Sequence, residues 1–232
     1  MKVSFLEWDS VFFNKRIFRI DLVKRLDFLD DIEERLPLEY DICYLFAQNK
    51  IIQSPNFNLK LVDTKVVYCK SVGNEIHVDS HITSFKGSIS QELLELAELS
   101  GQYSRFRLDP WINQEFGRLY ATWLKRSISR DIADEVFVYN DNESINGFVT
   151  VKRANRIATI GLISVNTLSQ GNGIGSKLIA AVESWCSKNN IEEIHVATQE
   201  ANRQACSFYS KYGFKEQAKS YIYHLHKKDD TI

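Results

Sequence analysis

Three glycines that alternate with other residues, Gly171, Gly173 and Gly175, form the stretch best suited to chemistry. An apolar, β-branched run at 157–165 precedes them, and apolar residues at helical spacing follow from Ile174. Alternating glycines allow a tight turn in which a ligand lies against bare backbone amides. A helix that begins there presents unpaired N–H groups and the positive end of its dipole. The stretch is therefore predicted to bind a phosphate or pyrophosphate group.

Two common phosphate-binding motifs do not fit this stretch. The dinucleotide fingerprint and the Walker motif would both require glycine where Ser176 stands, and the Walker motif would also require Ser or Thr in place of Leu178. The spacing that does fit is Q/R-x-x-G-x-G/A, supplied by Gln170, Gly173 and Gly175. Taken alone, a glycine-rich connector without a ligand is the alternative interpretation.

A second motif, N-x-x-A-x-x-F-Y-x-x-x-G-F, occupies residues 202–214. Asn202 is a suitable N-cap for a helix. Phe208 and Tyr212 are four residues apart and so share one helix face, while Gly213 is a typical C-terminal stop. An ordinary helix explains most of this segment by itself.

The two motifs stand in the order and at the distance seen in the GNAT family of N-acetyltransferases, which residues 86–226 resemble. The resemblance implies acetyl-CoA as co-substrate and no metal. It also implies an α/β (α+β) fold, with a mixed, mostly antiparallel sheet flanked by helices. In that fold the sheet splays between two strands, here 156–165 and 193–199, and the pantetheine arm of the cofactor lies in the gap.

The same resemblance implies roles for individual residues. Backbone groups of Ile163 and Val165 would pair with the pantetheine amides. The hydroxyl of Tyr209, with an ordinary pKa of about 10, would act as general acid toward the leaving thiolate. The complete set of implied cofactor-binding residues is Ile163, Ser164, Val165, Gln170, Gly171, Asn172, Gly173, Ile174, Gly175, Ser176, Asn202 and Tyr209.

Further motifs are similar to those of GNAT enzymes that acetylate a nucleotide-linked amino sugar for surface polysaccharide synthesis. They lie at residues 6–13, 104–111, 117–123 and 196–199. This similarity implies a dTDP-linked 4-amino-4,6-dideoxyhexose as acceptor, with substrate contacts from Arg105, Arg107, Trp111 and Arg118. Surface arginines that pair with carboxylates are the alternative for this segment. A different small-molecule amine, a protein amine, and a catalytically silent CoA-binding protein also remain open.

Composition and charge limit the partners. The 232 residues are 44% hydrophobic and 25% charged, as in ordinary globular proteins. A net charge of -1 provides no global field that would attract nucleic acid or an anionic membrane. The N-terminus lacks the features of a signal peptide, so we expect a cytoplasmic protein. The four cysteines form no C-x-x-C pair, which favours reduced thiols and no metal site.

The chain is expected to divide into a smaller N-terminal α/β unit, residues 1–85, and an acetyltransferase unit, residues 86–232, with a linker near 80–88. The N-terminal unit could bind substrate or pair subunits in a homodimer. Helices are expected at 27–36, 91–103, 115–129, 174–189 and from 202 onward. Strands are expected at 17–23, 42–47, 60–70, 135–139, 145–152, 156–165 and 194–198.

Overall fold

A computed structural model describes residues 2–22, 36, 39–51, 59–73, 77–141 and 144–227. The described strands form one ten-stranded sheet, in the order β1-β2-β3-β10-β4-β9-β8-β7-β6-β5. Their bounds are β1 (Lys2–Phe5), β2 (Ile17–Leu22), β3 (Ile42–Ala47), β4 (Leu59–Ser71), β5 (Ile82–Ser84), β6 (Glu135–Asp141), β7 (Ser144–Ala154), β8 (Ile157–Val165), β9 (Glu193–Gln199) and β10 (Lys215–His226). The sheet is mixed and mostly antiparallel: β2 with β3 and β8 with β9 are the parallel pairs among these strands.

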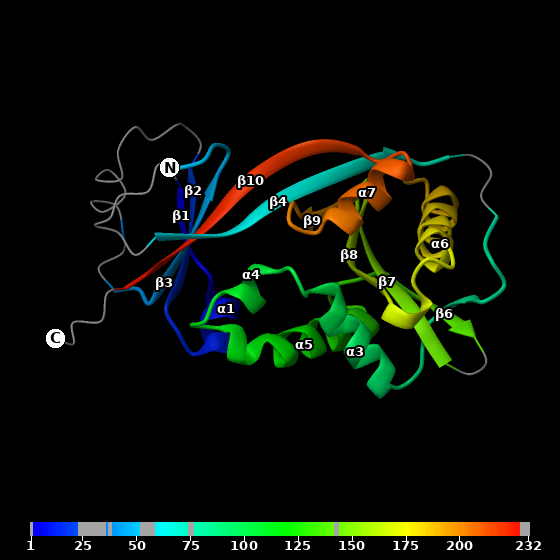
Figure 1. Cartoon of the computed structure of the whole chain (residues 1–232), viewed down its shortest axis with the longest axis horizontal. Helices are drawn as coiled ribbons and strands as arrows, with labels where there is room; N and C mark the ends of the chain where they lie inside the picture. The colour runs from blue at the N-terminus through cyan, green and yellow to red at the C-terminus, as the bar shows by residue number, and fades with distance from the viewer. Residues whose placement is uncertain are drawn as a thin grey trace.

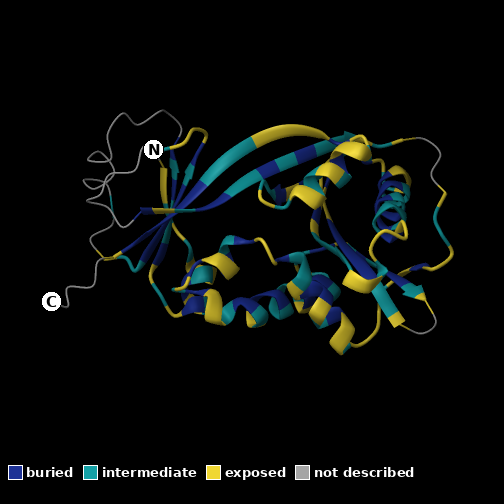
Figure 2. Ribbon diagram, viewed as in Figure 1, coloured by how far each residue is buried: buried dark blue, intermediate teal, exposed yellow. Residues whose placement is uncertain are grey.

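Helices cover both faces of this sheet. They are α1 (Glu7–Phe13), α3 (Gln91–Ser100), α4 (Arg105–Leu108), α5 (Phe116–Ile128), α6 (Ile174–Lys188) and α7 (Arg203–Lys211), with 3-10 turns η1 (Asn113–Glu115) and η2 (Thr167–Ser169). Apolar side chains of α6 and α7 pack with Val149 and Val151 on one face. Those of α1, α3, α4 and α5 pack with Phe148 on the other, because neighbouring strand residues point to opposite faces. Figure 2 shows the resulting mixture of buried and exposed positions along the helices and strands.

The two longest central strands, β4 and β10, connect the two ends of the molecule (Figure 1). β10 pairs with β3 along 221–226 and with β4 along 215–225, and β4 also pairs with β9. Strands from both expected units therefore share one sheet. The boundary at residue 85 does not divide that sheet, and as a division into folding units it stays a prediction.

Most expected elements form within one to three residues of their expected ends, including the 135–165 meander and the parallel pairing of β9. The expected linker at 80–88 instead contains β5, because Ile82 is buried and pairs with Tyr139. β1 and β10 were not expected from the sequence. The helix expected at 27–36 lies outside the described residues, apart from Leu36.

The sheet opens between β8 and β9, as the family resemblance implies. The two strands pair only from Ile157 with Glu193 to Ile160 with Val196. Beyond that point they diverge, so the β9-facing edge of residues 161–165 has no partner in β9. Backbone N–H and C=O groups along this edge can bond a ligand, except the Val165 carbonyl, which accepts from Gln170. No helix in the described part of the chain is long and apolar enough to cross a membrane.

Candidate active site

The glycine-rich loop joins β8 to α6 in the conformation that its glycines permit. Gly171 and Gly173 have φ values of 84° and 77°, in the left-handed region that other residues rarely adopt. Gly173 is the N-cap of α6, and helix α6 begins at Ile174. The first amides of α6 therefore face outward at the end of the loop, where they can bind an anion.

Two neighbouring contacts fix this loop. A Cβ at Gly175 would lie 3.2 Å from the ring of Phe208, so glycine lets α6 approach α7 closely. Gln170 donates from Nε2 to the carbonyl of Val165 at 3.2 Å, and its Oε1 accepts from Gln204 at 3.0 Å. The loop is thereby tied both to the end of β8 and to α7.

A cavity of about 320 Å³, which we call the loop cavity, lies between this loop, β8, α3 and α7. Eleven of the twelve residues expected to bind the cofactor line it: Ile163, Ser164, Val165, Gln170, Gly171, Gly173, Ile174, Gly175, Ser176, Asn202 and Tyr209. The twelfth, Asn172, is exposed and does not line it. The structure thus gathers residues of both sequence motifs around one concave surface.

A second cavity of about 250 Å³, the strand cavity, lies between the diverging ends of β8 and β9. Its walls include Thr150, Leu162, Thr198 and Gln199, together with Trp123 of α5. Five residues line both cavities: Ser100, Ile163, Asn202, Ala205 and Tyr209. The two cavities therefore meet at Tyr209.

Tyr209 is 4% exposed, and its ring lies among the rings of Tyr68, Phe208 and Phe214 at centroid distances of 5.4–5.7 Å. Burial raises the pKa of the Tyr209 hydroxyl well above its ordinary value. The expectation of an ordinary pKa is therefore wrong, because it ignored desolvation. A hydroxyl with a raised pKa keeps its proton at neutral pH, which is the state that a general acid needs.

Asn202 and Ser164 hold the cavity walls in place through side-chain bonds. The Asn202 carboxamide oxygen accepts from the Ala205 amide at 3.1 Å, as expected of an N-cap. Ser164 donates its hydroxyl to the Leu96 carbonyl at 2.6 Å, which joins β8 to α3. Sequence reasoning missed that the end of α3 contributes Leu99 and Ser100 to the loop cavity, and that the turn after it contributes Gln102. An ordinary apolar stripe gives no sign of what the far face of a helix contacts.

The four expected substrate residues do not line the loop or strand cavity. Arg105 is half-buried, and its guanidinium carbon lies 4.2 Å from the ring centre of Phe106. Arg107 is exposed. Arg118 donates to Glu115 and to the Phe12 carbonyl, each at 2.5 Å. Trp111 stacks on His226 with ring centres 4.5 Å apart. The structure does not bring these four together, and their substrate contacts stay predictions.

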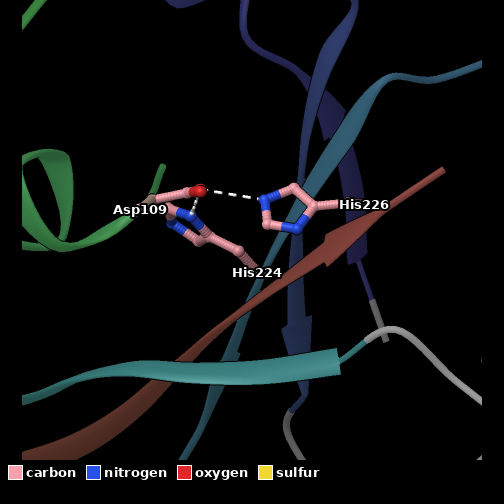
Figure 3. Close-up of side chains that lie close together, drawn as sticks. All are labelled: Asp109, His224 and His226. Carbon is pink, nitrogen blue, oxygen red and sulfur yellow. Dashed lines mark hydrogen bonds and ion pairs between the residues drawn. The ribbon is translucent and has the colours of Figure 1, made fainter. Parts of the chain in front are cut away.

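A buried cluster of Asp109, His224 and His226 was not found by sequence reasoning (Figure 3). Asp109 Oδ2 lies 2.5 Å from His224 Nδ1 and 2.9 Å from His226 Nε2. Ligands of a tetrahedral zinc ion would be about 3.3 Å apart, given bonds of about 2.0–2.1 Å, so these are hydrogen-bond distances. The long separation in sequence hides the cluster, although H-x-H on one strand places both histidines on one face.

The charge of Asp109 follows from these contacts. Burial by itself would raise the pKa of this carboxyl, but hydrogen bonds from His224, His226 and the Trp111 amide outweigh it and hold the pKa well below its usual range. Burial lowers the pKa of His224 to about 4, against the raising effect of Asp109. The cluster therefore holds one anionic carboxylate and a neutral His224 at neutral pH.

A model of the acetyltransferase (GNAT) family matches residues 93–214, which is more than half of the chain. The chain therefore belongs to the GNAT family, whose members use acetyl-CoA. Two curated relatives match shorter parts of it. A dTDP-fucosamine acetyltransferase of Escherichia coli O6:H1 is 26% identical over 131 residues, which cover 56% of each chain. An uncharacterized protein, YxbD, of Bacillus subtilis is 31% identical over 85 residues, which cover 37% of this chain and 52% of that protein. The chain spans about half the length of the curated relatives it matches.

Solved structures support the same fold. A conserved protein of unknown function from Staphylococcus epidermidis has a TM-score of 0.60 at 15% identity, with 92% of this chain and 85% of that chain covered. A GCN5-related N-acetyltransferase from Sphaerobacter thermophilus has a TM-score of 0.53 at 12% identity, with 87% and 66% covered. At these identities the likeness concerns the fold alone.

Proposed function

We propose that this protein is an acetyl-CoA-dependent N-acetyltransferase that acetylates the 4-amino group of a dTDP-linked 4-amino-4,6-dideoxyhexose. The observation that carries the proposal is the meeting of the loop and strand cavities at Tyr209. The loop cavity has the amides and glycines suited to a pyrophosphate and so would hold the cofactor. The strand cavity would then hold the acceptor amine.

In the proposed reaction the neutral amine attacks the thioester carbonyl directly, forming the C–N bond. Backbone N–H groups on the free edge of β8 near Ile163 would stabilise the developing oxyanion. As the C–S bond breaks, Tyr209 would give its proton to the leaving thiolate, while the amine proton passes to solvent. The raised pKa keeps the Tyr209 hydroxyl protonated at neutral pH but makes it a weaker acid toward the thiolate. The assignment therefore rests on the position of Tyr209, where the two cavities meet.

The acceptor class rests on two observations of different kind. The E. coli relative is named a dTDP-fucosamine acetyltransferase, at 26% identity. Within this chain, Arg105 is held against aromatic rings, and its buried Nε has no hydrogen-bond partner among the described residues. An unpartnered guanidinium N–H suits an anionic acceptor, which would share Arg105 with the nearby carboxyl groups of Asp9 and Asp63. Another small-molecule or protein amine is the alternative, and an open acidic groove near Tyr209 would have favoured a cationic protein lysine.

Release of CoA from acetyl-CoA should require the dTDP-4-amino-4,6-dideoxyhexose, and Tyr209→Phe should lower kcat by about 100-fold or more. Acetyl-CoA affinity should stay within about twofold, because the ring that packs in the cavity remains. Tyr68→Phe is the matched control, since Tyr68 contacts the Tyr209 ring but lines neither cavity.

An unchanged kcat in Tyr209→Phe would refute the acid assignment. Intact acetyl-CoA binding without turnover of the nucleotide sugar would refute the acceptor class while leaving the cofactor site. Turnover of a lysine peptide in preference to the nucleotide sugar would favour the alternative function.

A further inference from the structure

Buried polar atoms without partners gather in one place, apart from the loop and strand cavities. Six buried side-chain nitrogen or oxygen atoms have no hydrogen-bond partner within the described part of the chain. One is Arg130 Nη1. The other five belong to Tyr44, Asp63, Ser104, Arg105 and His224, which we call the Arg105 cluster. The Ser104 hydroxyl lies within reach of Tyr120, and the Asp63 carboxyl within reach of Gln199. Buried polar groups are normally satisfied, so the atoms of Tyr44, Arg105 and His224 most need an explanation.

Strand register explains why the sheet residues of the cluster share a face. Tyr44 of β3 lies opposite His224 of β10, and Asp63 of β4 lies opposite Ile222. Ile222 and His224 are two residues apart, and alternate residues of a strand point to the same face. Tyr44 and His224 accordingly stack with ring centres 4.3 Å apart.

Helix α4 supplies the other side of the cluster. The Arg105 guanidinium carbon lies 5.1 Å from the ring centre of Tyr44 and 5.8 Å from that of Phe46. Ser104 is 5% exposed and precedes the first residue of α4. The charge of Arg105 also acts on Asp63, whose pKa burial raises to about 6. Arg105 and Ser104 therefore face the polar row on the sheet.

Asp109 fixes which nitrogen of His224 is available. Its anionic carboxylate lies 2.5 Å from Nδ1 (Figure 3), so the hydrogen-bond pattern places the imidazole proton on Nδ1. Nε2 then carries a lone pair and is one of the five unsatisfied atoms. Asp109 is thus a positioning residue, and His224 Nε2 is a hydrogen-bond acceptor within the cluster.

Two residues, Gln199 and Tyr120, lie between the Arg105 cluster and the strand cavity. Gln199 lies within hydrogen-bonding reach of the Asp63 carboxyl and lines the strand cavity. Gln199 and Asp63 also line a further cavity of about 320 Å³, together with Leu108 of α4. Tyr120, which lies beside Ser104, lines the strand cavity as well. Gln199 and Tyr120 therefore separate the Arg105 cluster from the strand cavity, and movement of these two side chains would connect them.

The five groups define the chemistry of a fitting ligand. Arg105 is a charged donor that matches an oxyanion. His224 Nε2 and the Asp63 carboxylate are acceptors, so the ligand must also carry O–H or N–H donors. The Tyr44 and Ser104 hydroxyls can serve as either. A sugar phosphate combines an oxyanion with several separate hydroxyl donors, and so could reach Arg105 and both acceptors at once.

We propose that the Arg105 cluster binds the sugar-phosphate part of the acceptor, with the phosphate at Arg105 and hydroxyl groups at His224 and Asp63. This inference rests on the proposed function for the identity of the acceptor. Three members of the cluster lie outside the residues that the family model matches: Tyr44 of β3, Asp63 of β4 and His224 of β10.

The test compares the full-length parent with Arg105→Met, Tyr44→Phe and Asp109→Asn. Kinetics give the KM for the dTDP-4-amino-4,6-dideoxyhexose and for acetyl-CoA, and calorimetry gives the Kd for dTDP alone. Arg105→Met should raise the acceptor KM and the dTDP Kd by about 10- to 100-fold, as expected for a bond to a charged group. Tyr44→Phe and Asp109→Asn should raise both by about 2- to 10-fold.

The acetyl-CoA KM should stay within about twofold in these variants, which loss of folding would not allow. Tyr44→Phe keeps the ring stacked on His224 and so tests the site even if Arg105→Met does not fold. Arg153→Met, at an exposed arginine of β7, is the control and should bind dTDP like the parent.

The outcomes separate the two proposals. If the parent turns over the sugar and the variants keep its acceptor KM and dTDP Kd, the proposal that the Arg105 cluster binds the sugar phosphate is wrong. The proposed function would then still stand. No turnover, but dTDP binding that is lost in Arg105→Met, overturns the proposed acceptor and supports the cluster as a sugar-phosphate site. If the parent binds no dTDP, the proposal that the Arg105 cluster is a sugar-phosphate site is wrong.

Discussion

At the scale of single residues, the buried carboxylate of Asp109 determines the state of two histidines. It is fully buried and accepts from His224, His226 and a backbone amide. A buried charge is tolerated only with such partners. The bonds of Asp109 to His224 and His226 therefore link the segment after α4 to β10. These bonds are charge-assisted and so are stronger than neutral hydrogen bonds.

We predict that His224 makes stability depend on pH. Burial depresses its folded pKa to about 4, below the ordinary histidine value of 6.5. Between these two pKa values the unfolded chain binds more protons than the folded chain. The contribution of neutral His224 to the free energy of unfolding is therefore complete above about pH 6.5 and is lost as pH falls toward 4. The loss amounts to about 3 kcal/mol at most, since one pKa unit corresponds to about 1.4 kcal/mol.

The measurement is urea unfolding of the parent and of His224→Asn from pH 7.5 to 4. The gap in unfolding free energy between them should shrink on acidification. Asp63 acts in the opposite direction, because burial raises its pKa to about 6, but it is present in both proteins and largely cancels in the difference. A gap that is constant across this range would show that His224 is not buried as a neutral group.

The sequence indicated the chemistry of some residues and not of others, for a physical reason. The glycines and Tyr209 stand in short motifs whose spacing is itself the signal, and eleven of the twelve expected cofactor residues line one cavity. Asp109, His224 and Asp63 come together only through the pairing of β3, β10 and β4. No local pattern carries that information, because register between distant strands is set by the whole sheet.

At the scale of elements, the turn between β8 and α6 depends on glycine at its last loop position. Gly173 has a φ of 77° and caps α6. A Cβ there would strain the backbone by about 1–2 kcal/mol and would lie beside the amides that face the loop cavity.

We therefore expect Gly173→Ala to lower the unfolding free energy by about 1–2 kcal/mol. It should also raise the acetyl-CoA Kd, about tenfold for each 1.4 kcal/mol by which binding weakens. Gly213→Ala is the matched control, because Gly213 has a similar φ of 82° but lies outside both cavities. It should lose stability and keep acetyl-CoA affinity. Equal acetyl-CoA affinity in both variants would show that the loop is not part of the cofactor site.

Element prediction succeeded where the hydrophobic period was clear and failed where burial changes along the element. The apolar stripes of α3, α5 and α6 and the alternation of β6 and β7 predicted these elements correctly. β10 was missed because it begins with exposed polar residues and ends at 222–226 with side chains buried on both faces. Such a strand shows no alternation with a period of two.

At the scale of the whole molecule, β4 and β10 make the N-terminal strands part of the same sheet as the acetyltransferase core. β10 has β3 and β4 as its two neighbours, and both come from residues 1–85. Without them, the apolar residues of β10 would be exposed on an unpaired strand.

We predict that a fragment of residues 86–232 does not fold by itself. Circular dichroism and urea unfolding should show no cooperative transition for the fragment, whereas the full chain should give one. A fragment that unfolds cooperatively would instead support the boundary at residue 85 as a division between folding units.

The two ends of the described sheet bear on how this protein behaves at high concentration. The outermost described strands are β1, with four residues, and β5, with three. An open edge exposes backbone groups that can recruit further chains into a fibril, and short edges offer few such groups. The two longest described strands, β4 and β10, lie instead at the centre of the sheet. This strand order protects the chain against edge-to-edge aggregation while keeping its longest strands for the connection between its two halves.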